Sequence, residues 1–306
     1  MPVKGPITGS VAGSMTGVAD RAADRAADRV VIRPSRGAHG AVTWPTLRWV
    51  VMAPGDHQEA AAGSEGASDS PSASDSSDSH WVRWHKSYED PTSPLSLRLR
   101  IVQSMVRDFL DYVPRPPTHP GPVRMVSVCA GQGRDVIDVV ATHPRGGDVS
   151  ALLVELDPAL VAFARDRAAD AGVAEQVRIV EGDASLCRWY ESDVPADLVL
   201  VCGVFGNIGP GDIARTIQEL PGWCAMGSEV IWTRHRRPPD ATPAIRADFA
   251  SAGFTELAFE APDGYVLAVG RHRLDVEPAA GSVPSARKFD PALKLFDFVG
   301  DGGEPA

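Results

Sequence analysis

A glycine-spaced turn directly after a short apolar run constrains the fold of this chain more than any other feature. The apolar run 125–128 leads into Gly131-Gln-Gly133, and the amphipathic stretch 136–140 follows. This order is typical of the strand, loop and helix that begin a nucleotide-binding βαβ unit. Glycine has no Cβ, so the backbone of such a loop can approach a ligand closely.

Two further apolar runs also end in acidic residues. Glu155 follows the run 152–154 and lies 155 − 131 = 24 residues after Gly131. This separation is close to the roughly 20-residue offset at which a carboxylate grips a ribose. The run 177–180 leads through Glu181 and Gly182 to Asp183, which the sequence predicts to lie in a polar turn after a third strand.

Together these three strand ends resemble the class I S-adenosylmethionine-dependent methyltransferase family, over roughly residues 120–270. The resemblance implies that the glycine loop surrounds the methionine part of S-adenosylmethionine, that Glu155 holds both ribose hydroxyls, and that Asp183 lies beside the adenine. Two positions depart from the family pattern, because Ser127 stands where an acid is frequent and Cys129 where the first glycine is usual. The cofactor-binding residues expected on this basis are Cys129, Ala130, Gly131, Gly133, Glu155, Asp183, Ala184 and Cys202.

The pattern of strands and helices predicts an α/β fold. Expected strands at 124–129, 150–155, 177–181, 197–202 and 228–233 alternate with expected helices at 133–141, 158–171, 211–219 and 243–252. Such alternation implies a parallel sheet covered by helices on both faces. The apolar runs 254–260 and 265–270, joined by Ala-Pro-Asp-Gly, indicate a hairpin. We therefore expect a Rossmann-like, seven-stranded, mostly parallel sheet with a terminal antiparallel hairpin, which the methyltransferase family shows and dinucleotide dehydrogenases lack.

Composition divides the chain into four segments. Residues 1–78 contain Ala-Asp-Arg repeats and a Ser/Asp/Gly-rich stretch, and are expected to be largely disordered except for a short strand near 47–51. Residues 79–119 are expected to form a helical segment that packs on the catalytic domain. Residues 120–273 form the expected cofactor-binding domain, and the tail 274–306 is expected to pack back partly through an apolar cluster. That cluster comprises Leu293, Leu295, Phe296, Phe298 and Val299.

Charge and cysteine content limit the partners and the compartment. The net charge of −10 and the pI of about 5.3 argue against a general nucleic-acid binder, whose affinity depends on basic surface. The four cysteines show no zinc-binding spacing, so no metal site is expected. Reduced cysteines, the lack of a long apolar run and the lack of an apolar signal segment favour a cytoplasmic protein without a membrane partner.

Candidate catalytic residues follow the fourth and fifth expected strands, because ligands of open α/β sheets bind outside the carboxyl ends of the strands. Asn207 offers a donor and an acceptor, and His235 is a candidate base. A surface role for His235 and a packed loop around Asn207 are the alternatives. The basic residues 234, 236 and 237 either recognise an anionic acceptor or form a solvated loop. Upstream, Tyr88 and His85 are candidates for the acceptor pocket, or anchors for the N-terminal helix.

The sequence thus predicts an S-adenosylmethionine-dependent methyltransferase with a small-molecule acceptor. Two other functions stay open. One is a nicotinamide-dependent oxidoreductase, which would have a third glycine where Val136 stands. The other is a catalytically silent protein that binds the cofactor. A Rossmann-like protein whose glycines serve packing alone is the remaining structural alternative.

Overall fold

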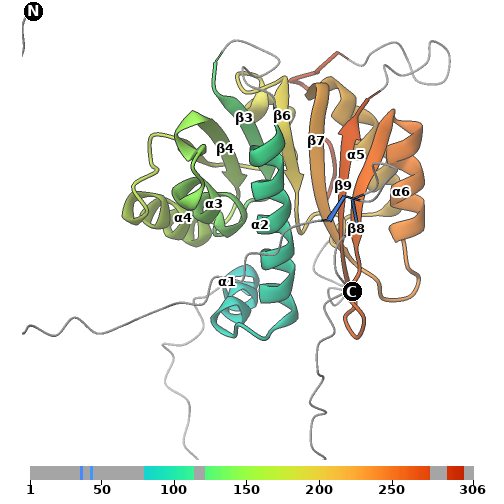
Figure 1. Cartoon of the computed structure of the whole chain (residues 1–306), viewed down its shortest axis with the longest axis horizontal. Helices are drawn as coiled ribbons and strands as arrows, with labels where there is room; N and C mark the ends of the chain where they lie inside the picture. Colours follow the sequence, from blue (N-terminus) through green and yellow to red (C-terminus); the bar gives the residue numbers. More distant parts are fainter. Residues whose placement is uncertain (1–34, 37–41, 44–78, 114–120, 276–287, 300–306) are drawn as a thin grey trace, which may run out of the picture. The chain divides into compact units, whose positions relative to one another are not determined.

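The computed structural model describes residues 35–36, 42–43, 79–113, 121–275 and 288–299 (Figure 1). The chain divides into two units, 1–69 and 70–306. In the first unit, strands β1 (Ser35–Arg36) and β2 (Val42–Thr43) form an antiparallel pair. The strand expected near 47–51 and most of the segment expected to be disordered lie outside the described residues. All that follows concerns the second unit.

The described part of this unit begins with two helices whose starts are capped. Helix α1 (His80–His85) begins at Ser79, whose side chain accepts a hydrogen bond from the Val82 N–H, and the 3₁₀ helix η1 (Lys86–Glu89) follows. Helix α2 (Pro94–Tyr112) begins at Ser93, which accepts from the Ser96 N–H. The Ser93-Pro94 pair is a favoured helix start, because serine satisfies a free N–H and proline lacks one.

The centre of the unit is one seven-stranded sheet in the order β5-β4-β3-β6-β7-β9-β8. Its strands are β3 (Val123–Val128), β4 (Val149–Glu155), β5 (Val177–Glu181), β6 (Ala196–Val201), β7 (Cys224–His235), β8 (Phe254–Glu260) and β9 (Leu267–Leu274). The first five strands in this order pair in parallel, and β9 pairs antiparallel with both β7 and β8. The predicted mostly parallel sheet with a terminal antiparallel pair is confirmed.

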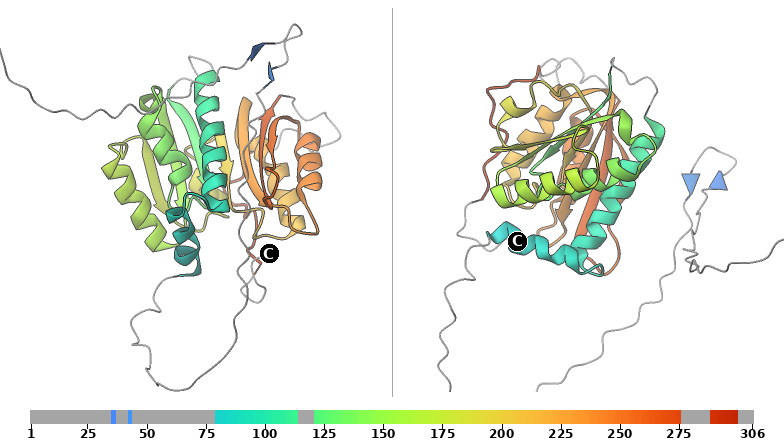
Figure 2. Two further views of the ribbon diagram at one scale, coloured as in Figure 1. Left: turned by 60° about the horizontal axis from the view of Figure 1, so that its bottom comes forward. Right: turned by 90° about the vertical axis from the view of Figure 1, so that its left-hand side faces the viewer.

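Helices cover both faces of the sheet (Figures 1 and 2). One apolar core joins the sheet to α2, α3 (Arg134–Thr142) and α4 (Pro158–Asp170), and the other joins it to α5 (Pro210–Glu219) and α6 (Thr242–Ser251). Adjacent strand residues serve opposite cores, as Met125 and Val126 do. This division follows from the alternation of side chains along a strand. Short 3₁₀ turns complete the connections: η2 (Gly146–Asp148), η3 (Cys187–Tyr190) and η4 (Leu220–Gly222).

The last strand differs from the expected run 265–270. Strand β9 begins at Leu267, which pairs with His235, and continues to Leu274. The apolar pattern stops at Gly270 because Arg271, His272 and Arg273 are polar. Neighbouring strands supply partners for these polar side chains within the sheet. Arg271 Nε, for example, lies 2.5 Å from Glu229 Oε2 on β7.

The C-terminal segment 288–299 lies against the sheet unit. Leu186 and Ile208 form isolated β-bridges with Lys294 and Phe298. Of the expected apolar cluster, Leu295 and Phe296 are buried, whereas Phe298 and Val299 are exposed. No helix among the described residues has the length and apolar character needed to cross a membrane.

Candidate cofactor site at the carboxyl ends of the strands

The glycine loop after β3 is held in a backbone conformation that glycine favours. Cys129, Gly131 and Gly133 have φ values of 54°, 56° and 67°. Within the loop, the Gly133 N–H donates to the Ala130 carbonyl at 2.9 Å, and the Ala130 N–H donates to Val154 on β4 at 3.0 Å. The two predicted glycines therefore occupy left-handed positions, and Cys129 shares that conformation despite its Cβ, which costs free energy.

Glu155 connects this loop to the end of β4. Its Oε2 accepts a hydrogen bond from the Gly131 N–H at 2.7 Å, and its Oε1 accepts from the N–H groups of Leu156 at 2.9 Å and Asp157 at 3.0 Å. A carboxylate has about four acceptor positions. Three are used here, so Glu155 has room for one ribose hydroxyl in this arrangement, whereas the resemblance implies two.

The environment of Glu155 shifts the pKa of its carboxyl above the ordinary value. Burial raises the pKa of this carboxyl, and the three backbone N–H donors act in the opposite direction. Burial also raises the pKa of the Cys129 thiol, and the charges of Glu155 and Asp183 add to that rise. The Gly131 N–H donates to the Glu155 side chain, and the Gly182 N–H donates to the Glu155 carbonyl at 2.8 Å, so the ends of β3, β4 and β5 lie at one edge of the sheet.

The turn after β5 is ordered around Asp183. Its Oδ1 accepts hydrogen bonds from the Ser185 N–H at 3.0 Å and the Ser185 hydroxyl at 2.6 Å, and the Ala184 carbonyl accepts from the Tyr190 hydroxyl at 2.8 Å. A Cβ on Gly182 would lie only 2.6 Å from Cε2 of Trp189, so the indole packs directly on the glycine. The indole Nε1 is buried without a hydrogen-bond partner.

Helix α1 lies over the glycine loop. A Cβ on Gly131 would lie 2.5 Å from Nε2 of His85, which is 7% exposed. At the start of the helix, the Ser79 hydroxyl donates to the Asp157 carboxylate, two residues beyond Glu155. In Figure 2, α1 (cyan) lies beyond one end of the sheet and not over either of its faces. His85 was a candidate for the acceptor pocket on sequence grounds, and the structure places it against the glycine loop.

The loop after β6 joins the ends of β6 and β7. Cys202 is buried, the Gly203 N–H donates to Thr233 Oγ1 at 2.8 Å, and Asn207 Nδ2 donates to the Gly203 carbonyl at 2.6 Å. Gly206 approaches His235 on β7, because a Cβ there would lie 3.6 Å from Cδ2 of the imidazole. The loop that carries Asn207 therefore lies against His235 at the end of β7. The Asn207 side chain is engaged within that loop through its bond to Gly203.

The two candidate histidines present different atoms. His85 Nδ1 lies 2.7 Å from the Trp81 carbonyl, so in the neutral ring Nδ1 carries the proton and Nε2 carries the lone pair. His235 Nδ1 accepts a hydrogen bond from the Arg237 N–H at 3.3 Å, which leaves the proton on its buried, unpartnered Nε2. Burial lowers the pKa of both histidines. Catalysis by His235 stays a prediction, and action as a base through Nε2 requires the opposite tautomer.

A polar cluster that sequence reasoning missed surrounds Tyr88. The Tyr88 hydroxyl accepts a hydrogen bond from Arg98 Nη2 at 2.9 Å, and burial raises its pKa to about 12. Arg98 Nη1 lies 3.8 Å from the Cβ position of Gly203, so the cluster connects η1 and α2 with the loop after β6. In the first turn of α3, the buried Asp135 Oδ1 has no hydrogen-bond partner among the described residues. The only feature of the sequence that could have pointed to Asp135 as a site residue is its position two residues after Gly133. Arg98 had none, because it stands among other charged residues of an amphipathic helix.

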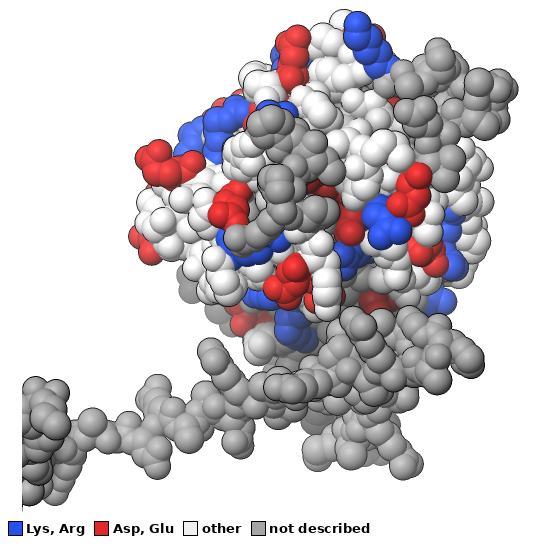
Figure 3. Space-filling model, turned by 45° about the horizontal axis from the view of Figure 1, so that its top comes forward, with Lys and Arg blue, Asp and Glu red and all other residues white. Residues whose placement is uncertain are grey.

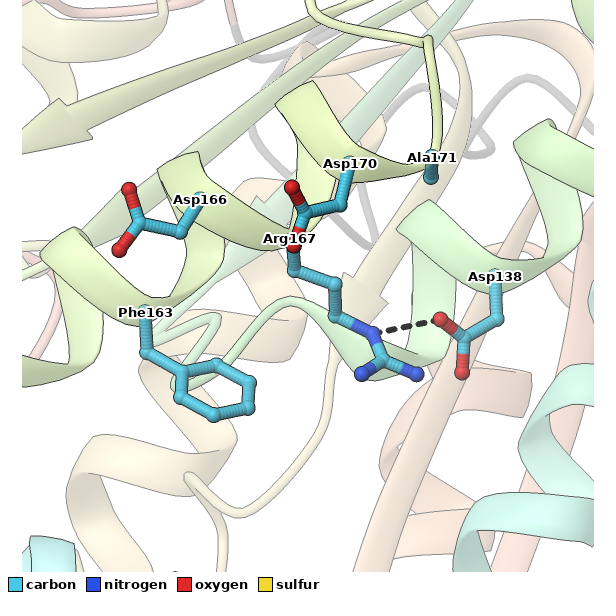
Figure 4. Close-up of a pocket in the computed structure, with 6 residues that line it drawn as sticks. All are labelled: Asp138, Phe163, Asp166, Arg167, Asp170 and Ala171. Carbon is cyan, nitrogen blue, oxygen red and sulfur yellow. Dashed lines mark hydrogen bonds and ion pairs between the residues drawn. The ribbon is translucent and has the colours of Figure 1, made fainter.

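A hollow of about 470 Å³ lies elsewhere, on the outer surface of α3 and α4 (Figure 4). An ion pair of 2.6 Å between Arg167 and Asp138 spans it. The lining residues are Asp138, Phe163, Asp166, Arg167, Asp170 and Ala171. None follows the carboxyl end of a strand, so this hollow is separate from the candidate cofactor site.

The described surface is mixed in charge and offers no metal-binding cluster. On the face shown in Figure 3, basic and acidic side chains lie interspersed. Within the described ranges, no group of three His, Cys, Asp or Glu side chains is arranged to hold a metal ion. All four cysteines are free thiols.

Comparisons with known proteins find similar solved structures at low sequence identity. No protein-family model matches the chain, and no curated protein matches it. An O-methyltransferase family protein from Burkholderia thailandensis is similar over 65% of this chain and 62% of its own, with 17% identity and a TM-score of 0.47. An RNA methyltransferase from Salinibacter ruber in complex with S-adenosyl-L-homocysteine is similar over 56% and 92%, with 21% identity and a TM-score of 0.36.

A third similar structure is the precorrin-6y C5,15-methyltransferase from Geobacter metallireducens, over 57% of this chain and 87% of that one. Its identity is 14% and its TM-score 0.40. The similar solved structures are mostly class I S-adenosylmethionine-dependent methyltransferases. In the described part of the chain, the seven-stranded, mostly parallel sheet with its terminal antiparallel pair is the Rossmann-like fold that the resemblance to this class implied.

Proposed function

We propose that this protein is an S-adenosylmethionine-dependent methyltransferase that acts on a small-molecule acceptor. One observation carries the proposal: the left-handed glycine loop after β3 is hydrogen-bonded to Glu155 at the end of β4, and that carboxylate keeps one acceptor position. A glycine turn at the carboxyl end of a parallel strand, beside a carboxylate with a remaining acceptor position, fits a nucleoside sugar and the chain attached to it. The Gly182 N–H donates to the Glu155 carbonyl at 2.8 Å, so the turn with Asp183 lies beside Glu155 and extends this fit to a third strand.

The residues that would hold S-adenosylmethionine are those of the three strand ends. The backbone of the left-handed loop at Gly131 and Gly133 would contact the methionine part, Glu155 would accept one ribose hydroxyl, and the turn at Asp183 would flank the adenine. Bound there, the cofactor supplies a methyl group on a sulfonium, which is already an activated leaving group. The protein would orient the acceptor and exclude water, and such positioning contributes several kcal/mol to catalysis.

An acceptor oxygen or nitrogen that loses a proton needs a base nearby. Among the candidate residues, neutral His85 carries its lone pair on Nε2, which faces the glycine loop. We propose His85 as the first residue to test for this role, ahead of His235. Tyr88 would serve as a neutral hydroxyl at ordinary pH, because its pKa is raised to about 12.

Calorimetric titration with S-adenosylmethionine, S-adenosylhomocysteine and NADH tests the proposal. Binding of the two adenosyl compounds without NADH supports it, and binding of NADH alone would establish the oxidoreductase alternative. Release of S-adenosylhomocysteine with a panel of small acceptors then separates an enzyme from a silent cofactor-binding protein. Glu155→Ala is the matched variant, and the exposed Glu181→Ala is its control, since Glu181 pairs with Glu155 on the next strand.

A further inference from the structure

The basic run 234–237, Arg-His-Arg-Arg, lies at the carboxyl end of β7. Ligands of open α/β sheets bind at this edge, and β6 separates β7 from β3, the strand that leads into the glycine loop. Arg234 Nη1 donates to the Phe205 carbonyl, and a Cβ on Gly206 would lie 3.6 Å from Cδ2 of His235. Both side chains therefore contact the loop after β6. Each is half-buried, so a ligand on this edge can reach it.

Arg234 and His235 have hydrogen-bond donors that the protein leaves unused. Arg234 Nε and His235 Nε2 are buried and have no partner among the described residues. His235 Nε2 carries the proton of the neutral ring, because Nδ1 accepts from the Arg237 N–H. Within the described ranges, neither Arg234 nor Arg237 has a carboxylate within 4.0 Å. Buried donors without partners cost free energy, which a ligand with acceptor atoms would recover.

The acidic residue closest in sequence to this run is already engaged. Asp240 lies 3.4 Å from Arg236 and accepts hydrogen bonds from the N–H of Thr242 at 2.9 Å and from its hydroxyl at 2.8 Å. Arg236 is therefore paired, whereas Arg234 and Arg237 keep their charge for another group. Guanidinium groups bind carboxylates and phosphates through paired N–H donors, so an oxyanion fits these two arginines.

Exposed aromatic side chains adjoin the same loop. The Val299 N–H donates to the Asn207 carbonyl at 3.0 Å, so the C-terminal segment lies against the loop after β6. The preceding residue, Phe298, is 42% exposed, and its ring centre lies 6.4 Å from that of Trp81 on α1, which is 37% exposed. Aromatic side chains contribute large apolar area when a ligand covers them. The loop after β6 thus joins a basic strand end to an aromatic surface.

We propose that the methyl acceptor is a small aromatic acid whose carboxylate or phosphate binds Arg234, Arg237 and the Nε2–H of His235. Its ring would lie against Trp81 and Phe298. The word acceptor rests on the proposed function, whereas the anion site needs only these residues. Strands lie about 4.8 Å apart, so the end of β7 is roughly 10 Å from the glycine loop and leaves the cofactor its own place. The net charge of −10 disfavours a polyanion such as nucleic acid.

Three probes test the charge of the ligand. Benzoate and phenyl phosphate carry an oxyanion on a ring, and benzamide is the neutral analogue of benzoate. In ligand-observed NMR titrations of the protein saturated with S-adenosylhomocysteine, at least one of the two acids should bind about tenfold more tightly than benzamide. The acid that binds more tightly identifies the oxyanion. Equal affinity for all three probes, or binding of neither acid, would overturn the proposal.

Variants of the basic run test the residues. Arg234→Met should weaken binding of the preferred acid about tenfold, and Arg237→Met, at a more exposed position, about threefold. Arg236→Met is the matched control, because it removes the same charge from a side chain that is paired with Asp240. It should change the affinity less than about twofold. Equal losses in the three variants would reduce the effect to net charge and refute the assigned residues.

Arg234→Lys keeps the charge at position 234 and should give an intermediate loss, because an ammonium lacks the paired donors. This variant also covers the case of an Arg234→Met protein that does not fold. Trp81→Ala and Phe298→Ala test the ring and should each weaken benzoate about threefold. Their control is Tyr112→Ala on α2, where the aromatic ring is 78% exposed and far along the helix from its start. Unchanged affinity in both aromatic variants would refute the place of the ring.

The outcome separates this inference from the proposed function. Wild-type protein that binds S-adenosylhomocysteine but neither acid refutes the aromatic acid and leaves the methyltransferase proposal intact. Wild-type protein that does not bind S-adenosylhomocysteine refutes the methyltransferase proposal. Titration of the unliganded wild type and of Arg234→Met with the two acids then decides the anion site alone. Thermal melting of each variant confirms that a lost affinity reflects the site and not unfolding.

Discussion

The backbone N–H of Gly131 donates a hydrogen bond of 2.7 Å to Oε2 of Glu155, although the two residues are 24 positions apart in the chain. The same carboxylate accepts from Leu156 and Asp157 through its other oxygen. Glu155 thus fixes the shape of the glycine loop before any ligand arrives. Its carboxylate links the stability of the loop to the affinity of the site.

Replacing Glu155 should therefore affect both properties. Glu155→Ala removes an acceptor from three N–H groups, so we expect the free energy of unfolding to fall by about 1–3 kcal/mol. The affinity for S-adenosylhomocysteine should fall by about 1–3 kcal/mol as well, through loss of a charge-assisted ribose bond. Urea denaturation and calorimetry measure the two effects. Glu181→Ala should change neither, and unchanged ligand affinity in Glu155→Ala would show that this carboxylate does not contact the sugar.

The left-handed conformation of Cys129 predicts that glycine at this position is more stabilising than alanine, the reverse of the order expected in a regular strand. At a φ of 54°, a Cβ is strained, so Cys129→Gly should be more stable than Cys129→Ala by about 1 kcal/mol. Both variants remove the thiol, so the comparison isolates the Cβ. Ser127 lies in the extended strand β3, and there Ser127→Ala should be the more stable of the matched pair. Urea denaturation of the four variants measures the preference, and an alanine advantage at both positions would contradict the left-handed loop.

The contact between Gly182 and Trp189 predicts strong coupling at the turn after β5. A Cβ on Gly182 would lie 2.6 Å from Cε2 of the indole, so Gly182→Ala should cost about 1–3 kcal/mol through overpacking. In a Trp189→Ala background the same change should cost much less, because the obstructing ring is gone. A double-mutant cycle measures this coupling. Gly147→Ala is the control, since no atom lies within 4 Å of its Cβ position, and additive effects at 182 and 189 would refute the contact.

His272 predicts a loss of stability in mild acid. Its Nδ1 accepts a hydrogen bond from Trp232 Nε1 at 3.2 Å, and burial lowers its pKa from 6.5 to about 4. Between these values the unfolded chain binds a proton that the folded protein does not, so the contribution of His272 to stability is complete above pH 6.5 and declines as the pH falls toward 4. The full effect is about 3 kcal/mol.

The His272→Gln variant isolates this effect, because glutamine retains an acceptor for the Trp232 indole and does not titrate. Its free energy of unfolding should depend less on pH between 6.5 and 4 than that of the wild type. His80→Gln, at an exposed position, should follow the wild-type curve. Parallel curves for the wild type and His272→Gln would show that His272 protonates equally in both states.

Local sequence signals were enough to predict most elements of the sheet unit. Helices α2 and α4 begin at Ser93-Pro94 and Asp157-Pro158, and these starts need only residues adjacent in the chain for their capping. The glycine turn at Gly131 was equally local. The extent of β9 was not, because His272 and its polar neighbours suit a strand only when flanking strands supply their partners.

Sequence alone determined the α/β class, the glycine loop and the acidic strand ends, because each depends on residues close together in the chain. Tertiary structure alone decided the functional geometry: His85 covers Gly131, Glu155 bonds to the loop, and Arg98 on α2 reaches Gly203 beyond the end of β6. The physical reason is that strand direction and helix packing bring side chains together at one edge, and no local pattern records which of them remain without a partner.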